Sequence, residues 1–397
     1  MSTPPPDRRA LVILLSVVFL NIAGFGLVIP LLPFFGRALD APPWQIALLF
    51  SAFSFGQFLG EPFWGRLSDR VGRRPVLLAT IAASALAYVA LAFAPTIWLA
   101  FLARFAGGFL SGNISTLQGC LADITPPEER AAKMGIMGSA FSLGFMVGPG
   151  LGGLLARPEL GTLGFQIPLF AAAGFGLLAA LGVVFFVKES RPGTPDMRPP
   201  GRRAALREAF AHPVVSRILA ISFITVAGFA GIEATYGLWT EHRFGWGPRE
   251  IGFAFMAIGV LGAYCQGVLT GFLVRRFSEP RVLTAGLVLM WFGMIFQFGS
   301  PNWQVAMVGF AFVCVGQSIC FPNIAALISQ ATPPDRQGEM LGLNMSNMAL
   351  ARIGGPIYAG QLFSHVHPGA AFLVTAILIV PATILAVQIM RRLPARA

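Results

Sequence analysis

The chain has 397 residues, of which 55% are hydrophobic and only 11% are charged, and its mean hydropathy is +0.72. Soluble domains carry about 25% charged residues, so the composition excludes a soluble globular protein. The net charge of +11 could point to nucleic acid, but the basic residues lie in short clusters between apolar runs, which argues against a nucleic-acid partner.

Apolar runs that are long enough to cross a hydrocarbon core of about 30 Å recur along the whole chain. Because the runs lack the alternation of barrel strands, they predict membrane-spanning helices. The expected fold class is an all-α integral membrane protein with twelve transmembrane helices in two six-helix repeats. The predicted spans are residues 10–35, 44–67, 75–94, 97–121, 133–156, 165–187, 214–241, 248–275, 282–299, 303–328, 338–362 and 368–390.

The longest polar stretch, residues 188–213, divides the spans into six and six. We predict an N-terminal half at 1–187, a cytoplasmic linker at 188–213 and a C-terminal half at 214–397. The linker combines a proline-rich start with an Arg-rich amphipathic piece, which favours a segment along the membrane surface. Basic-rich and basic-poor loops alternate, and the positive-inside rule then places both termini in the cytoplasm.

Two sequence repeats relate the halves. "TPPEERAAKMG" (125–135) matches "TPPDRQGEMLG" (332–342), and "GRLSDRVGRRPVLLA" (65–79) is echoed more weakly by "GFLVRRFSEPRVLTA" (271–285). Parallel repeats of this kind are a transporter architecture, with the substrate near the midplane between the halves. In the register of the first repeat Arg352 takes the place of Phe145, so one half has a charge where the other is apolar.

Charged groups inside membrane spans are costly, so each one is a functional hypothesis. Glu233 lies roughly 24 Å along span seven and Arg352 about 20 Å along span eleven, so the two could pair. Protonation of Glu233 would then release Arg352, whereas the alternative is a static buried ion pair. Glu61, near the end of span two, could be an inner proton site or join a gate, and Arg104 could pair with Glu233 instead.

Four stretches carry a resemblance to a known family. The first three are "GRLSDRVGRRP" (65–75) between spans two and three, "RFAGGFLSG" from Arg104 in span four, and "GSAFSLGFMVGPGLGG" (138–153) in span five. The fourth, which is more typical of efflux pumps, combines "GFGLVIPLLPFF" in span one with "TEHRFGW" (240–246) after span seven. On these motifs the chain resembles the drug:proton antiporters of the major facilitator superfamily, in particular the tetracycline-type efflux pumps. The resemblance implies a proton-coupled secondary transporter that exports small amphipathic drugs or metabolites by alternating access, in the inner membrane of a bacterium.

The first and third stretches are predicted to form the gate. Gly65 and Gly72 would allow a tight turn, and the span-five glycines would seal the interface between the halves. Asp69 would pair with Arg70, Arg73 or Arg74, or with a helix N-terminus across the domain boundary. The alternatives are arginines that only anchor topology and glycines that serve ordinary packing. The predicted gating residues are Gly65, Asp69, Arg70, Gly72, Arg73, Arg74, Gly144, Gly148, Pro149, Gly152 and Gly153.

The other candidate residues concern protons and substrate. The predicted proton-coupling residues are Glu233, Glu61, Asp123, Arg104 and Arg352. The predicted substrate-binding residues are Asn21, Gln57, Phe25, Tyr236, Trp239, Gln317, Asn344, Asn347 and Arg352. Tetracycline pumps typically carry acids in spans one, three and nine, where this chain has Asn21, Ala87 and an apolar run around Met290, so coupling is expected to use the acids named above.

The sequence has no HExxH motif, nucleophile elbow or phosphate-binding loop, so neither an enzyme nor an ATP-driven transporter is expected. The four cysteines lack metal-ligand spacing, so we expect no metal and no cofactor, with the proton gradient as the driving force. The expected partners are a small-molecule substrate, protons and the lipid bilayer, and the protein is predicted to be monomeric. Competing functions are a sugar or metabolite exporter or uniporter without proton coupling, and a membrane sensor or interaction protein on a transporter scaffold.

Overall fold

Helices account for every regular element of the residues that the computed structural model describes, namely 8–126, 129–189, 212–333 and 336–392. This observation confirms the predicted fold class. Within these residues, eleven helices are long and apolar enough to cross a membrane. Residues 190–211 of the predicted linker lie outside the described residues, as do the chain ends 1–7 and 393–397.

Spatial proximity groups the helices into two compact units. Unit 1 comprises Met1–Met197 and Trp246–Gly259, and unit 2 comprises Arg198–Gly245 and Val260–Ala397. Helix α11 (Pro248–Tyr264) therefore begins in unit 1 and ends in unit 2.

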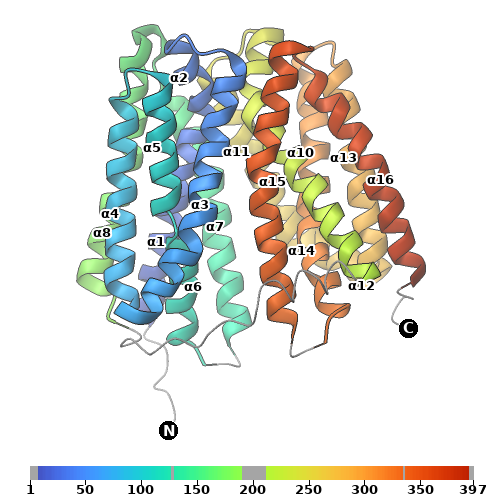
Figure 1. Cartoon of the computed structure of the whole chain (residues 1–397), viewed down its shortest axis with the longest axis horizontal. Coiled ribbons are helices and arrows are strands. Elements are labelled where there is room, and N and C mark those ends of the chain that lie inside the picture. The colour runs from blue at the N-terminus through green and yellow to red at the C-terminus, as the bar shows by residue number, and fades with distance from the viewer. Residues whose placement is uncertain (1–7, 127–128, 190–211, 334–335, 393–397) are drawn as a thin grey trace. The chain divides into compact units, whose positions relative to one another are not determined.

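The helices of unit 1 lie side by side in Figure 1. They are α1 (Arg8–Val28), α2 (Leu32–Ala38), α3 (Pro43–Val71), α4 (Arg73–Ala92), α5 (Ile97–Leu110), α6 (Asn113–Asp123), α7 (Arg130–Leu155) and α8 (Gln166–Phe186), with the 3-10 segments Ile29–Leu31 and Pro158–Phe165. A buried apolar cluster joins α1, α4, α6, α7 and α8, with Leu14, Leu77, Leu117 and Val183 among its members. This packing fixes α4 and α6, which carry Arg73 and Asp123, against the rest of unit 1.

The helices of unit 2 form a second bundle (Figure 1). They are α10 (Pro213–Phe244), α12 (Thr270–Phe277), α13 (Glu279–Gly299), α14 (Trp303–Gln330), α15 (Gln337–His365) and α16 (Ala370–Arg392). Helix α15 corresponds to the eleventh predicted span (338–362) but is absent from the eleven apolar helices of the described residues, although it has 29 residues. Its mean hydropathy is low because it carries Asn344, Asn347 and Arg352.

Three predicted spans are interrupted rather than continuous. Span one has a 3-10 turn at Ile29–Leu31, where Pro30 lacks the N–H that an α-helix requires. Span four breaks at residues 111–112, between α5 and α6. Span eight contains a π-helical turn at Cys265–Leu269, and the Thr270 hydroxyl donates to the Cys265 carbonyl at 2.8 Å. The hydropathy of a span does not reveal such breaks, because the residues on either side remain apolar.

The weaker sequence repeat has a counterpart in the backbone. Gly72, with φ of +113°, precedes α4, and Ser278, with φ of +73° and ψ of 153°, precedes α13. These two residues are equivalent when Gly65 is aligned with Gly271. The same left-handed step thus starts both helices, although only one of the two residues is a glycine.

Ser278 occupies a backbone region that is essentially reserved for glycine and costs of order 1–3 kcal/mol for other residues. We therefore expect Ser278→Gly to raise the free energy of unfolding by about 1 kcal/mol, after the greater entropy loss of glycine is subtracted. Thermal unfolding of the detergent-solubilised protein would measure this change. The control is Ser142→Gly inside α7, which should lower stability, and a loss of stability in Ser278→Gly would contradict the prediction.

Candidate functional site

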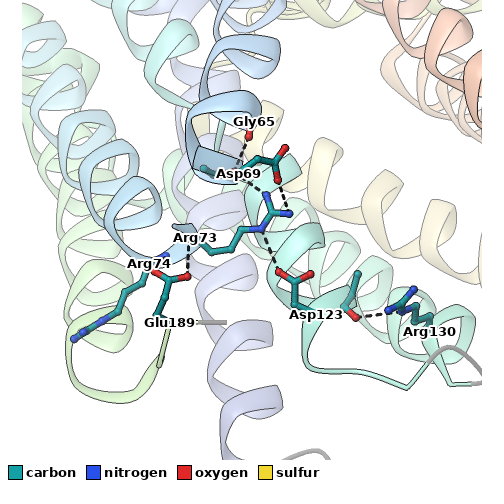
Figure 2. A network of polar contacts seen from close by, with 9 residues as sticks. Gly65, Asp69, Arg73, Arg74, Asp123, Arg130 and Glu189 are labelled. Atoms are coloured by element: carbon teal, nitrogen blue, oxygen red, sulfur yellow. Dashed lines mark hydrogen bonds and ion pairs between the residues drawn. The ribbon is translucent and has the colours of Figure 1, made fainter. Parts of the chain in front are cut away.

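The centre of the candidate site is Arg73, the first residue of α4. Its guanidinium lies 2.9 Å from Asp69 Oδ1 through Nη2 and 3.3 Å from Asp123 Oδ2 through Nε, and Nη1 donates to the Ser68 hydroxyl at 2.8 Å. Figure 2 shows these contacts, which join the end of α3, the start of α4 and the end of α6. We call these four residues the Arg73 network.

Burial differs across the Arg73 network. The side chain of Arg73 is 10% exposed, that of Asp123 is 22% exposed and that of Asp69 is 47% exposed. The contact between Arg73 and Asp123 is therefore the better shielded of the two ion pairs, and the contact to Asp69 is weakened by solvent. The structure thus brings Asp123, predicted for proton coupling, into the group of residues that were predicted for the gate.

The glycines of this motif differ in their geometry. Gly72 supplies the predicted turn, because its φ of +113° is unfavourable for other residues. The tight turn expected at Gly65 is wrong, since Gly65 lies within α3 and an added Cβ would meet only the Ser115 hydroxyl, at 3.7 Å. The Gly65 carbonyl instead accepts a hydrogen bond from Ser68 at 2.8 Å. Gly65 therefore supports the network through its backbone.

Sequence reasoning missed two residues that surround this network. The carboxylate of Glu189 accepts hydrogen bonds from the backbone N–H groups of Arg73 and Arg74, and Arg130 Nε donates to the carbonyls of Ala122 and Thr125 (Figure 2). Arg74 in turn donates to the Val184 carbonyl at 2.6 Å. The charges of these side chains are visible in the sequence, but their distance along the chain from the motif hides the contact.

The glycines of α7 divide between two neighbouring helices. An added Cβ would lie 2.7 Å from Phe19 O at Gly144, 2.5 Å from Ala23 O at Gly148 and 2.1 Å from Leu27 O at Gly152. All three glycines therefore pack their backbone directly against α1. Pro149 lies within the same stretch of α7, and its ring packs where Gly26 of α1 leaves space.

A second face of α7 contacts the start of α11 within unit 1. An added Cβ at Gly153 would lie 2.5 Å from Pro248 O, and one at Gly252 would lie 2.5 Å from Pro149 O. Gly150 meets the Met256 sulfur in the same way, at 2.8 Å. Small residues allow helices to approach this closely, which the sequence pattern had predicted without indicating the two separate partners.

Arg104 of α5 is buried, with 4% of the residue exposed. Its guanidinium carbon lies 4.4 Å above the centre of the Phe53 ring, and its Nε donates to the Leu49 carbonyl at 3.3 Å. The Phe53 ring is also 4.9 Å from that of Phe25. Two predicted residues from α1 and α5 thus meet on an aromatic residue of α3 that sequence reasoning did not select.

The polar pair on α3 consists of Gln57 and Glu61, one helical turn apart. Gln57 Nε2 donates to Glu61 Oε1 at 3.0 Å. Asn21 of α1 lines a small cavity of about 10 Å³ with Ile114 and Met137, close to the minimum that holds one water molecule, and its Nδ2 is buried without a hydrogen-bond partner in the described structure. These residues remain candidates for proton coupling and substrate binding.

The predicted ion pair between Glu233 and Arg352 is not formed. The Arg352 side chain is exposed, and in the described part of the chain its guanidinium makes no hydrogen bond or ion pair. The reason is angular: Ala351 and Gly355 face α10, which turns Arg352 about 100° away around α15. Equal depth along two helices was therefore insufficient to predict contact, and the roles of both residues in coupling stay predictions.

The substrate candidates of unit 2 are mostly engaged in packing. Tyr236 is fully buried and stacks on Phe310 with 4.2 Å between ring centres, and Trp239 meets Phe372 edge-on at 4.9 Å. Asn347 Nδ2 donates to the Leu219 carbonyl of α10 at 2.9 Å. The remaining two residues, Asn344 and Gln317, each have a buried side-chain oxygen without a hydrogen-bond partner in the described residues. Substrate contact by these side chains stays a prediction.

Comparison with known proteins gives a consistent picture. The family model of the Major Facilitator Superfamily matches residues 14–270 and 239–397. The chain is 30% identical over 367 residues to tetracycline resistance protein, class C, of Escherichia coli, with 90% of each chain covered. It is 28% identical to multidrug resistance protein 2 of Bacillus subtilis (strain 168), covering 90% of this chain and 89% of that protein.

The fold also resembles a solved structure. A bacterial homologue of the human lysosomal transporter Spinster, in an inward-facing and unoccupied conformation, superposes with a TM-score of 0.82. The match covers 98% of both chains at 16% sequence identity, so it supports the fold alone. The fold and the relatives are those of membrane transporters rather than enzymes.

The Arg73 network predicts unequal effects for its two carboxylates. We expect Asp123→Asn to lower the free energy of unfolding by about 1–2 kcal/mol, because a shielded charge-assisted contact is lost while Asp69 still neutralises part of the arginine. Asp69→Asn should cost less, about 0.5 kcal/mol, since Asp69 is half exposed. Denaturation of both variants in detergent tests the order, and Glu129→Gln, which breaks an exposed pair with Lys133, is the control.

The backbone contacts of α7 predict a sharp difference between two glycines. Gly152→Ala should lower the free energy of unfolding by about 1–3 kcal/mol, because its Cβ would overlap the Leu27 carbonyl. Gly138→Ala should be neutral or slightly stabilising, since no atom lies within 4 Å of its added Cβ. Thermal unfolding of the two variants measures the difference, and similar melting temperatures would disprove the packing role of Gly152.

Proposed function

Because this chain belongs to the major facilitator superfamily, we propose that it is a proton-coupled exporter of small amphipathic drugs or metabolites that works by alternating access. Tetracycline resistance and multidrug resistance proteins are its relatives at about 30% identity, which supports an efflux substrate of this class. The proposed site of action is the cytoplasmic membrane of a bacterium, with both termini in the cytoplasm. The proton gradient would drive transport without a cofactor.

The observation that carries the proposal is the shared position of Arg73 between Asp69 and Asp123. One arginine that holds two carboxylates from different helices joins three helix ends in a single polar cluster. Such a cluster can stabilise one conformation of a transporter and be broken in another. The direct backbone contact of α7 with α11 supports the same proposal, because a gap-free helix contact hinders the passage of water and protons.

The substrate class follows from the side chains available within unit 1. Phe25 and Asn21 lie one helical turn apart on α1, the Phe25 ring contacts Phe53, and the Arg104 guanidinium lies over the Phe53 ring. A ligand with a flat apolar part and an acceptor group fits this combination. Tetracycline itself is a weaker candidate, because Asn21, Ala87 and an apolar run around Met290 stand where tetracycline pumps typically carry acids.

A uniporter or metabolite exporter without proton coupling is the second candidate. The observation that favours it is the set of missing acids, two of which are replaced by buried apolar residues: Ala87 is 8% exposed and Met290 is 0% exposed. Proton coupling would then depend on Glu233, Glu61 or Asp123. The proposed transporter acts as a monomer and needs only substrate, protons and lipid.

Reconstituted liposomes with an imposed pH gradient separate these functions. Luminal pH is recorded while candidate drugs, including tetracycline, are added to vesicles with the wild-type protein, Glu233→Gln or the exposed-residue control Glu159→Gln. We expect substrate-dependent proton movement in the wild type and control, and a loss of at least tenfold in Glu233→Gln, because glutamine cannot carry the proton.

Two other results have distinct meanings. Substrate-dependent proton movement that persists in the Glu233→Gln variant would indicate that Glu61 or Asp123 couples transport to protons. Substrate uptake by the wild-type protein without any proton movement would favour the uniporter.

A further inference from the structure

Glu189 lies three residues beyond the end of α8 and belongs to unit 1. Its Oε1 accepts the backbone N–H of Arg73 at 2.8 Å and its Oε2 accepts the backbone N–H of Arg74 at 3.1 Å, across 116 and 115 residues of sequence. A carboxylate on the first N–H groups of a helix also interacts favourably with the helix dipole. Glu189 is thus a cap for α4 that is supplied from far away in the chain.

Gly72 is shaped for this contact as well as for the turn. An added Cβ at Gly72 would lie 2.6 Å from Glu189 Oε2 and 2.9 Å from its carboxyl carbon. The carboxylate therefore rests directly on the backbone of the residue that precedes α4. A side chain at this position would displace Glu189 even if the backbone tolerated it.

Arg74 provides a reciprocal contact between the same two helices. Its Nη2 donates to the Val184 carbonyl at 2.6 Å, in the last turn of α8, where an arginine complements the negative end of the helix. The start of α4 is therefore connected to this part of the chain twice, once through the Glu189 side chain (Figure 2) and once through the Arg74 side chain. Both connections involve residues adjacent to the Arg73 network.

The start of α13 in unit 2, which is equivalent to the start of α4, takes its acid from its own helix. Glu279, the first residue of α13, aligns with Arg73 and places an acid in the first turn of the helix itself. An acid from the local sequence is therefore sufficient to complement the start of this type of helix. In unit 1 the acid is instead Glu189, which lies beyond the end of α8 and 116 residues from Arg73 in sequence.

We propose that Glu189 is a positioning residue of the gate, which fixes the backbone of Arg73 so that its guanidinium reaches Asp69 and Asp123. The chain just beyond the end of α8 is thereby attached to the Arg73 network. A displacement of Glu189 would loosen the backbone of Arg73 and weaken its ion pairs. The gating consequence rests on the proposed function, whereas the positioning of Arg73 does not.

The first test is hydrogen–deuterium exchange of the purified full-length protein in detergent. In Glu189→Gln, peptides that contain the amides of Arg73 and Arg74 should exchange about tenfold faster than in the wild type, because a charged acceptor is lost. The control Glu159→Gln, an exposed carboxylate elsewhere in unit 1, should leave these peptides unchanged. Unchanged exchange in Glu189→Gln would overturn the proposal.

A double-mutant cycle tests the connection to the ion pairs. If Glu189 positions Arg73, Glu189→Gln and Asp123→Asn should together lower the melting temperature by clearly less than the sum of their separate shifts. Additive shifts would mean that Glu189 only caps α4 and would overturn the positioning role. A matched cycle of Glu159→Gln with Asp123→Asn should be additive.

Transport kinetics in the liposomes of the previous section provide the functional measurement. Glu189→Gln should lower kcat about threefold or more with little change in KM, because Glu189 contacts the gate and not the substrate. A change confined to KM would contradict the gating consequence. If the wild-type protein moves none of the compounds offered, the proposed function fails, while the exchange and melting experiments still decide whether Glu189 positions Arg73.

Discussion

The structure depends first on the close approach of helix backbones at glycine. In a bilayer the hydrophobic effect does not drive helices together, so van der Waals contact must do so, and it is strongest where side chains are absent. An added Cβ at Gly56 or Gly60 of α3 would lie 2.1 Å from a carbonyl oxygen of α5, and one at Gly108 of α5 would lie 2.0 Å from Phe53 O. Gly293 and Gly316 join α13 to α14 in the same manner. These contacts set the helix positions on which every polar site relies.

Polar groups are arranged around these contacts in two different ways. Within the helices, hydroxyl groups mostly bond to their own backbone, as Thr225 does to Ile221 and Thr240 to Tyr236, so they need no partner from another helix. At the end of unit 1, by contrast, Arg73 gathers carboxylates from separate helices. The Arg73 network thus links three helix ends through charged side chains. A transporter that must break and re-form contacts can change such a cluster without disturbing the packed interior.

Features that depend on a local sequence pattern were predicted, whereas contacts that depend on how distant residues are oriented in space were missed. The spans, the turn at Gly72 and the involvement of Asp69 and Arg73 follow from hydropathy and from one short motif. The pairing of Asp123 with Arg73 and the capping by Glu189 involve separations of 50 and 116 residues, which no local pattern reveals. Arg352 was predicted to pair with Glu233 from equal distance along two helices, but the side of α15 that it occupies depends on which residues face α10.

Helix α11 has a consequence for attempts to divide the chain. Its residues up to Gly259 belong with unit 1, although they follow the connecting segment in sequence. A fragment that stopped at the end of α8 would leave the backbone faces at Gly150 and Gly153 uncovered, because Met256 and Pro248 would be missing. A first piece that covers these faces would need the start of α11, up to Gly259, as well as the first six spans.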